Sequence, residues 1–459
     1  MNQQPQPAQE NKMGVMPVHR LLLTMSGPMM LSMLIQALYN VVDSMFVSYI
    51  SEAALTAVSL AYPMQNLMIA VATGTGVGIN ALLSRNLGEK NFVMANRTAG
   101  NAIFLGLVSY GVFALLGVFG SRLYFTAQVE DPEIIALGCD YLSIILVLSI
   151  GCFGQVLLSR LLQSTGKTFY SMVIQMVGAG LNIVLDPIMI FGLMGFPRMG
   201  VAGAALATII AQSLTVAGSL ICLFRDREHP VRRRHFRLQK RMMVKMLRIG
   251  VSPFGLSLMP SVITVYNNLQ CLAYGGDLAV SAYAVINYFI GSVLLLLEGV
   301  GEGMQPLISY ASGAGDYAAM RRLKNRGLMT VLVFSALFLI ACVPAVDLLP
   351  GFFGTSAGTA AVIRSALPIL GLAFPMMGLG KLFTSYFYAC GETLYSTLLV
   401  YLDPVLFTPL CIFILPRLFG LKGVWMALPG AQALIMAVLV VLWGLHKSTL
   451  RSKEAEYAG

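Results

Sequence analysis

The stretch GTGVGINALLSRNLG at residues 74–88 decides the fold, because the chain repeats it as GVGEGMQPLISYASG at residues 299–313. The two stretches lie 225 residues apart and share three glycines at alternate positions, a leucine, a serine and a final glycine. The same shift aligns residues 166–171 with residues 391–396. The repeated unit is therefore half the chain, which excludes a solenoid of short repeats. A duplicated half in a very apolar sequence is typical of a membrane transporter.

The composition indicates a protein that lies mostly within a membrane. Of its 459 residues, 57% are hydrophobic and 11% are charged, and the mean hydropathy is +0.77. Soluble domains carry about 25% charged residues. Apolar stretches of roughly 20 residues cross a bilayer, and each must be a helix because lipid cannot satisfy the backbone of an open strand. Twelve such stretches occur, at residues 21–48, 54–84, 98–120, 134–157, 166–193, 200–224, 247–275, 279–310, 326–349, 360–388, 396–416 and 423–445.

The predicted fold class is an all-α polytopic membrane protein with twelve transmembrane helices in two six-helix bundles. Because each half has an even number of spans, the bundles should form a parallel repeat with a pseudo-two-fold axis along the membrane normal. We expect a disordered cytoplasmic tail at residues 1–19, a first bundle at 20–224 and a basic cytoplasmic linker at 225–246. The second bundle then covers residues 247–446, and a cytoplasmic tail follows at 447–459.

The basic residues predict the orientation of the chain. The sequence has 30 Lys and Arg residues and a net charge of +10, and all but five of the 30 fall on one side of the predicted spans. The five exceptions are Arg122, Arg198, Arg364, Arg417 and Lys422. Since basic residues collect on the cytoplasmic side, both termini should lie in the cytoplasm, and Lys381 should belong to the inner group. The net charge therefore indicates topology and not nucleic-acid binding.

Other function classes lack support in the sequence. All four histidines fall in predicted tails or loops, so a histidine proton relay is excluded and carboxylates remain as proton carriers: His19, His229, His235 and His446. No nucleophile–histidine pair or zinc-ligand cluster lies in the predicted spans, so we do not expect an enzyme. Nothing in the pattern indicates a ring-like channel pore. The seven cysteines form no close pair and fit small buried hydrophobic positions.

The candidate acidic residues inside predicted spans are Asp43, Asp186, Glu298, Glu302 and Asp403. An ionisable side chain in a membrane span costs at least a few kcal/mol, so each of these residues is a candidate for function. The alternative is a structural hydrogen-bond network that fixes the register of the helices.

In the first span, Gln36, Asn40 and Asp43 are spaced at i, i+4 and i+7, so they share one face of the helix. Asp43 should lie in the outer half of the membrane, roughly 30 Å from the cytoplasmic end of its helix at 1.5 Å per residue. The sequence therefore predicts a polar stripe that ends on a carboxylate.

The fifth span carries a second polar group at a similar depth. Asn182 precedes Asp186 by one helical turn, and Pro187 frees the backbone carbonyl of Ile183 from its usual hydrogen bond. Thr208, near the outer end of the next span, should lie at the same level. A carboxylate, an amide and a free carbonyl are oxygen ligands that suit a hard cation.

The second bundle has a different charge pattern. Glu298 and Glu302 are one helical turn apart, whereas their counterparts under the 225-residue shift, Thr73 and Val77, are uncharged. Asp186 has no acidic counterpart under the same shift. Two carboxylates this close should not both ionise in a low dielectric. A structural or lid role for this pair is as well supported as a direct role in coupling.

Several short motifs occur in a characteristic order from about residue 20 to 445. They are residues 36–43 (QALYNVVD), 87–88 (LG), 163–166 (QSTG), 181–192 (LNIVLDPIMIFG), 200–208 (GVAGAALAT) and 305–310 (QPLISY). Each is weak alone, but together they make the chain similar to the multidrug and toxic compound extrusion (MATE) family, in particular to its MepA-like bacterial branch.

The resemblance implies an antiporter of the bacterial cytoplasmic membrane that exports organic cations and other drugs in exchange for H⁺ or Na⁺, by alternating access. It implies a coupling-cation site at Asp43, Asn182, Asp186 and Thr208, which is also the possible Na⁺ site. No other cofactor is expected. The expected substrate cavity comprises Gln36, Tyr39, Asn40, Gln175, Glu298 and Glu302. The sequence departs from some branches of the family, because Asn267 and Asn268 stand where those branches place an acid.

The abundance of Met, Phe and Tyr, at 27, 24 and 18 residues, would suit a cavity for bulky cations. The alternative function is a lipid-linked oligosaccharide flippase, which also pairs two bundles but needs a strongly cationic cavity. The acids within the predicted spans favour the antiporter. The expected partners are small-molecule drugs and the lipid bilayer, with no nucleic acid. We expect a monomer, because a chain with both bundles needs no partner to form a cleft.

Overall fold

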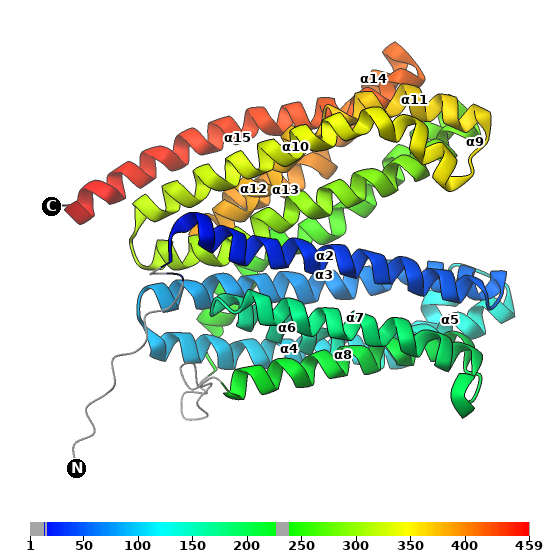
Figure 1. The fold of residues 1–459 in the computed structure, drawn as a ribbon, viewed down its shortest axis with the longest axis horizontal. Coiled ribbons are helices and arrows are strands. Elements are labelled where there is room, and N and C mark those ends of the chain that lie inside the picture. Colours follow the sequence, from blue (N-terminus) through cyan, green and yellow to red (C-terminus); the bar gives the residue numbers. More distant parts are fainter. Residues whose placement is uncertain (1–12, 14–15, 226–237, 459) are drawn as a thin grey trace. The chain divides into compact units, whose positions relative to one another are not determined.

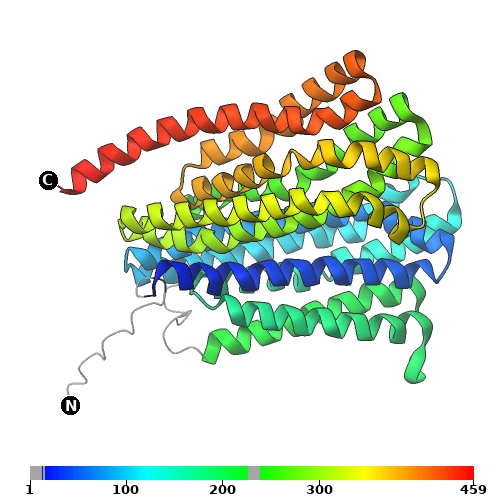
Figure 2. The same cartoon turned by 45° about the horizontal axis from the view of Figure 1, so that its top comes forward.

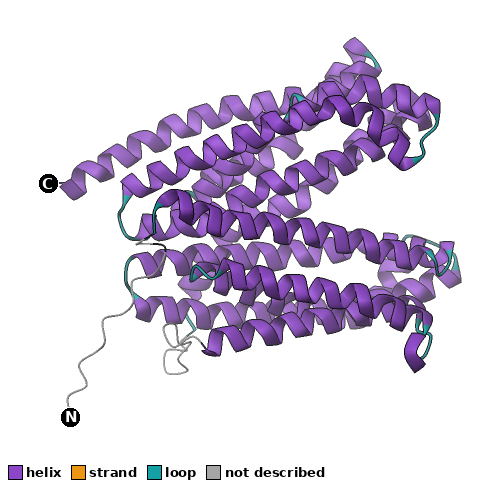
Figure 3. Cartoon of the chain, viewed as in Figure 1, coloured by secondary structure: helices purple, strands orange, loops and turns teal. Residues whose placement is uncertain are grey.

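The structure, a computed structural model, describes residue 13 and residues 16–225 and 238–458 (Figure 1). The described residues are almost entirely helical and include no strand (Figure 3). Contacts divide the chain into two compact units, Met1–Ser257 and Leu258–Gly459. The division falls within a helix, beyond the basic linker that we predicted at residues 225–246, and most of that linker lies outside the described residues.

The first unit contains the helices of the predicted first bundle. They are α2 (Val18–Ser48), α3 (Glu52–Gly88), α4 (Phe92–Thr126), α5 (Pro132–Val147), α6 (Ile150–Ser164), α7 (Thr168–Phe191), the short η1 (Leu193–Gly195), α8 (Gly200–Arg225) and the first turns of α9 (Lys240–Gly313). The pair α5 and α6 forms one span that bends by 42°. α2 packs along α7, and α7 packs along α8 (Figures 1 and 2).

The second unit contains the rest of α9 and seven further helical segments. They are α10 (Tyr317–Phe353), α11 (Ala357–Gly371), α12 (Phe374–Cys390), α13 (Thr393–Leu402), the π-helical η3 (Asp403–Phe407), α14 (Thr408–Phe419) and α15 (Leu421–Ala458). The pair α11 and α12 forms one span that bends by 46°. A π-helical segment next to a proline marks a local break in the regular hydrogen-bond ladder.

Helices in both units begin where the sequence supplies a cap. The side chains of Ser51, Asn91 and Asp131 accept hydrogen bonds from backbone N–H groups in the first turns of α3, α4 and α5. Asp316 and Ser356 do the same for α10 and α11. Capping satisfies donors that would otherwise be left unpaired at each helix start.

α9 contains two spans. Its 74 residues would measure about 110 Å at 1.5 Å per residue, far more than the ~30 Å core of a bilayer. The helix is interrupted at Gly276, where φ is 61° and ψ is −160°. Among the described residues, nine helices could cross a membrane, or eleven when each bent pair counts as one span. Division of α9 at Gly276 gives twelve spans, and the predicted fold class is confirmed.

The repeated glycines allow close helix packing. A Cβ atom on Gly74 would lie 2.7 Å from the carbonyl oxygen of Gly250, and one on Gly78 would overlap the carbonyl oxygen of Met246. In the second copy, a Cβ on Gly301 would lie 2.7 Å from the hydroxyl oxygen of Ser385. These contacts support packing as the role of the glycine triplets, because a side chain would force the backbones apart.

The chain departs from the prediction at its C-terminal end. The predicted tail begins at residue 447, but α15 continues to Ala458. The sequence after Leu445 has no glycine or proline before residue 459 and is rich in helix-forming residues, so nothing ends the helix earlier. His446 therefore lies inside the helix, only 2% exposed, and its ring contacts those of Tyr386, Phe387 and Trp443. Its predicted position in a tail is wrong.

The structure gives no side-chain environment for the other three histidines. His19 belongs to α2, whose first residue is Val18, but its side chain is not described. His229 and His235 lie outside the described residues, as does most of the predicted N-terminal tail.

Replacement of Gly78 by alanine should destabilise the first unit. The added Cβ must displace the backbone at Met246, and overpacking of this kind costs at least about 1 kcal/mol. The midpoint of thermal unfolding in detergent should fall. Gly111→Ala in α4 is the matched control, because nothing lies within 4 Å of its Cβ position. Equal midpoints for the two variants would contradict the packing role.

Candidate functional site

Three of the four predicted cation-site residues form one hydrogen-bonded group. The Nδ2 atom of Asn182 donates to Oδ1 of Asp186 at 3.2 Å and to Oγ1 of Thr208 at 3.4 Å. α7 supplies the first two residues one turn apart, and α8 supplies the third. Asp186 is fully buried, and the other two side chains are at most 8% exposed. The amide thus joins the carboxylate to the neighbouring helix.

Asp43 completes this group from α2, which packs along α7. The charges of Asp43 and Asp186 repel each other, and both act on the hydroxyl group of Tyr39, one turn before Asp43. The structure therefore brings the two carboxylates within electrostatic range. No hydrogen bond joins these two described side chains, so their interaction is unfavourable while both are charged.

The group contains three buried oxygen atoms without a donor. They are Oδ1 of Asp43, Oδ1 of Asn182 and Oδ2 of Asp186, and none has a hydrogen-bond partner within the described part of the chain. A buried polar atom left unpaired costs about 1–3 kcal/mol, and more if it is charged. Oxygen atoms of this kind fit either a proton on a carboxyl group or a hard cation such as Na⁺.

A cavity lined largely by amide- and hydroxyl-bearing residues lies beside this group in the first unit, between α2, α6, α7 and α8. Its lining residues are Ser32, Ile35, Gln36, Tyr39, Gln155, Gln175, Gly178, Ala179, Asn182, Thr208, Ala211, Gln212 and Thr215. Asn182 and Thr208 belong to both the cavity and the cation group, so the two sites share a wall.

The predicted cavity residues are only partly brought together. Gln36, Tyr39 and Gln175 line the cavity of the first unit. The side chain of Asn40 is not among those described. Glu298 and Glu302 belong to the second unit and do not line this cavity.

Sequence reasoning missed two amides of the cavity wall, Gln155 and Gln212. The Oε1 atom of Gln212 is buried and has no hydrogen-bond partner among the described residues. Neither residue shares a helix face with a candidate carboxylate, in contrast to Gln36 and Asn182. An uncharged amide in an apolar span also needs a partner, and that signal could have identified both residues.

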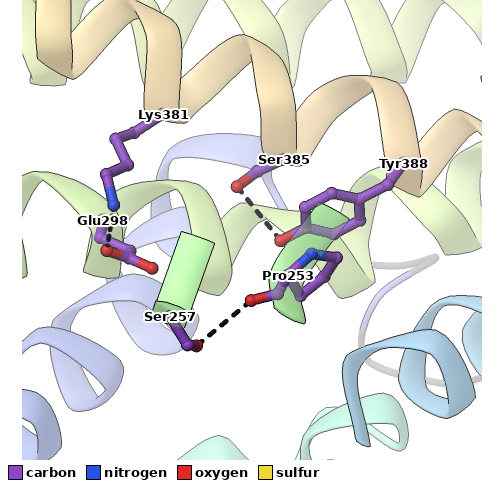
Figure 4. A network of polar contacts seen from close by, with 6 residues as sticks. All are labelled: Pro253, Ser257, Glu298, Lys381, Ser385 and Tyr388. Carbon is purple, nitrogen blue, oxygen red and sulfur yellow. Dashed lines mark hydrogen bonds and ion pairs between the residues drawn. The ribbon is translucent and has the colours of Figure 1, made fainter. Parts of the chain in front are cut away.

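In the second unit, Glu298 pairs with a lysine. The Nζ atom of Lys381 lies 2.6 Å from Oε2 of Glu298, and this ion pair joins α9 to α12 (Figure 4). Our assignment of Lys381 to the cytoplasmic group is wrong, because it lies in the middle of α12 and its charge is matched by Glu298. Glu302, one turn further along α9, is 6% exposed.

Asp403 has a complete set of partners. Its Oδ1 accepts a hydrogen bond from Thr408 at 2.7 Å, and its Oδ2 accepts one from Nε2 of Gln432 at 2.6 Å. Gln432 lies on α15, so this carboxylate also bridges two helices. Both oxygens have protein donors, in contrast to the carboxylates of the first unit.

Asp403 resembles Asp186 in its local sequence but not in its position along the helix. Each aspartate stands in a Leu-Asp-Pro sequence on the fifth span of its half. Asp186 lies 18 residues after Thr168, where α7 begins, whereas Asp403 lies 10 residues after Thr393, where α13 begins. Because Thr168 and Thr393 align under the 225-residue shift, the two carboxylates stand at different levels of their spans.

A chain of twelve apolar spans in two repeated helical bundles, with a carboxylate group beside a polar cavity, is a multi-pass membrane protein of the transporter class. The family model MatE matches residues 28–188 and 257–413, one segment in each half, and the chain belongs to this family of transporters.

Relatives and solved structures agree with this assignment. The multidrug export protein MepA of Staphylococcus aureus (strain MRSA252) is 26% identical over 438 residues, which cover 94% of each chain. A structure of MATE in the straight conformation matches with a TM-score of 0.89 and 22% identity, covering 97% of this chain and 99% of that one. A structure in the bent conformation matches with a TM-score of 0.87 and 23% identity, covering 95% and 97%.

Loss of the Gln432 side-chain amide should destabilise the second unit. Gln432→Leu leaves a buried Asp403 oxygen without its donor, which should lower the free energy of unfolding by about 2 kcal/mol. The addition of Asp403→Asn should recover part of this loss, because the unmatched charge is gone. Thermal unfolding in detergent measures both effects, and a double variant no more stable than the single one would contradict this account.

Proposed function

We propose that the chain exports organic, mostly cationic drugs from a bacterial cell in exchange for H⁺ or Na⁺. In this proposal it is a monomer in the cytoplasmic membrane with both termini in the cytoplasm. The observation that carries the proposal is the trio of unpaired oxygens on Asp43, Asn182 and Asp186, next to a polar cavity. The similarity to MepA, whose name describes multidrug export, supports the choice of substrate.

The coupling cation would act by removing repulsion. When Asp43 and Asp186 are both charged, α2 and α7 are held against an unfavourable interaction. A proton or Na⁺ neutralises that interaction and lets the two helices settle closer together. Binding at these carboxylates therefore changes the position of α2 relative to α7.

α2 links the cation group to the cavity. Asp43 lies one turn from Tyr39, and Tyr39 and Gln36 line the cavity. Pro28 interrupts the hydrogen bonds of the same helix and provides a place for bending. A shift of α2 on cation binding would reduce the cavity and expel its ligand. The existence of straight and bent structures with this fold supports such a change.

The cavity chemistry favours cationic ligands. Its lining has amide and hydroxyl groups but no Lys or Arg. Asn182, which lines the cavity together with Thr208, donates a hydrogen bond to the carboxylate of Asp186. A flippase for pyrophosphate-linked lipids needs positive charge at this position, so the lining supports the exporter over that alternative.

Asp43→Asn and Asp186→Asn should each reduce ethidium efflux from cells at least about tenfold, because an amide cannot bind and release a proton. The measurement is the rate of loss of ethidium fluorescence after energisation. Asp140→Asn on α5 is the control, since that carboxylate is exposed and should leave efflux unchanged. Undiminished efflux in either test variant would contradict the coupling role.

The driving ion can be identified in proteoliposomes with an imposed pH gradient or Na⁺ gradient. We expect at least one gradient, applied alone, to drive dye transport, and we expect Asp186→Asn to abolish the response to it. Initial rates of dye uptake against gradient size provide the measurement. A rate of dye uptake that is the same with and without each gradient would contradict antiport.

A further inference from the structure

Basic residues from two helices of the second unit meet beside Trp443. The Nζ atom of Lys324, on α10, lies 4.5 Å from the centroid of the Trp443 ring, on α15. Arg321, one turn before Lys324, and Lys447, one turn after Trp443, act on the charge of this ammonium group. We call these four residues the interfacial cluster. A cation–π contact therefore joins two helices at a point where three positive charges come together.

The three positive charges of the interfacial cluster repel one another. Lys324 is half-buried, and the charges that act on it, those of Arg321 and Lys447, are both positive. Among the described residues, no carboxylate forms an ion pair with Lys324 or Lys447. A negatively charged ligand at this position would therefore relieve the repulsion.

Aromatic side chains hold the Trp443 ring in place. Its centroid lies 5.2 Å from that of Phe383 and 5.7 Å from that of Tyr386, both on α12, and the rings meet edge to face. The buried ring of His446 contacts the indole at 5.7 Å. Because the indole is packed on these sides, it presents a fixed surface to Lys324.

The basic residues of α10 are not part of the repeated frame. Under the 225-residue shift, which aligns Arg322 with Arg97, Lys324 falls on Ala99 and Arg321 falls on an asparagine. A general preference for basic residues on one side of the membrane would act on both halves alike. The second half therefore carries a basic site that the first half lacks at this position.

The interfacial cluster lies where membrane spans meet the lipid headgroups. Lys324 stands just before one predicted span, and Trp443 stands in the last turn of another. Tryptophan and lysine suit this level, because each has an apolar body and a polar end. Towards the membrane, Met329 on α10 and Val440 on α15 are 62% and 71% exposed. A ligand with a negative head and apolar chains matches this order of surfaces.

We propose that the interfacial cluster binds the phosphate headgroup of an anionic phospholipid, whose acyl chains then lie along α10 and α15. Basic residues next to a membrane span attract anionic lipids, and basic pockets between spans bind their headgroups. The inference goes beyond the proposed function, because it holds whichever compounds the chain exports.

Trp443 can report on the lipid at this site, because the chain has two tryptophans and the other, Trp425, is only 1% exposed. The complete chain with Trp425→Phe is reconstituted in mixed vesicles of phosphatidylglycerol and phosphatidylcholine, in which one of the two lipids carries brominated chains. Bromine quenches the fluorescence of a nearby indole, so exchanging the brominated lipid gives the relative affinity of the site for the two headgroups. Phosphatidylglycerol should be preferred at least about tenfold.

Variants of the basic residues test whether the interfacial cluster causes the preference. Lys324→Met and Lys447→Met should each lower it about fivefold, because each removes one charge near the headgroup. Arg326→Met is the matched control, since it removes an exposed positive charge two residues from Lys324 on another face of the same helix. It should leave the preference unchanged. Each preference is a ratio within one variant, so a change in the brightness of Trp443 cancels.

Three outcomes would overturn the inference. Equal quenching by the two lipids in the chain with both lysines would exclude a preference for negative headgroups. An unchanged preference in both lysine variants would place the lipid elsewhere. Relief of quenching by inorganic phosphate, but not by sodium chloride of equal ionic strength, would show a site for a free anion instead of a lipid.

The test does not depend on the folding of Trp425→Phe. The original chain can be compared with Trp443→Phe, which should lose most of the lipid-dependent quenching because the remaining tryptophan is buried. If Trp443→Phe keeps that quenching, the lipid lies near Trp425 and the assignment to the interfacial cluster is wrong.

Discussion

The requirement that every buried charge find a partner organises the whole molecule. Within lipid there is no water to satisfy a carboxylate or an amide, so each must be paired by the protein or by something that it binds. In the second unit, the protein supplies these partners: Thr408 and Gln432 for Asp403, and Lys381 for Glu298. In the first unit, the group of Asp43, Asn182 and Asp186 has three oxygens without donors among the described residues. These oxygens support the proposed cation site.

The two repeated halves share the same arrangement of helices, but the polar residues within these helices differ. The Leu-Asp-Pro sequence stands on the fifth span of each half, beside a sixth span that begins with a close glycine contact. In the first unit, Asn182 donates to Asp186 but leaves one carboxylate oxygen open. In the second, Gln432 and Thr408 occupy both oxygens of Asp403. The same short sequence therefore carries a carboxylate with an open oxygen in one unit and a carboxylate that bridges two helices in the other.

Much of the fold could be predicted because its causes are local. Apolar stretches of sufficient length, turn residues and the repeat define twelve spans, and only the end of α15 was misplaced. The grouping of Asn182, Asp186 and Thr208 was also predictable, since helical spacing and depth place them together.

The remaining features depend on packing that the sequence does not display. Gln155 and Gln212 each need a partner in an apolar span, but the sequence does not show that they line the same cavity. The partner of Lys381 is 83 residues away along the chain, and only the contact between α9 and α12 reveals it.

The reversal at Gly276 has a consequence for biogenesis. A single residue with φ of 61° separates two spans that are otherwise continuous helix, with no polar loop between them. Residues with side chains rarely adopt this backbone conformation. A replacement of Gly276 would therefore strain the link that newly made spans must form, even though nothing lies within 4 Å of its Cβ position.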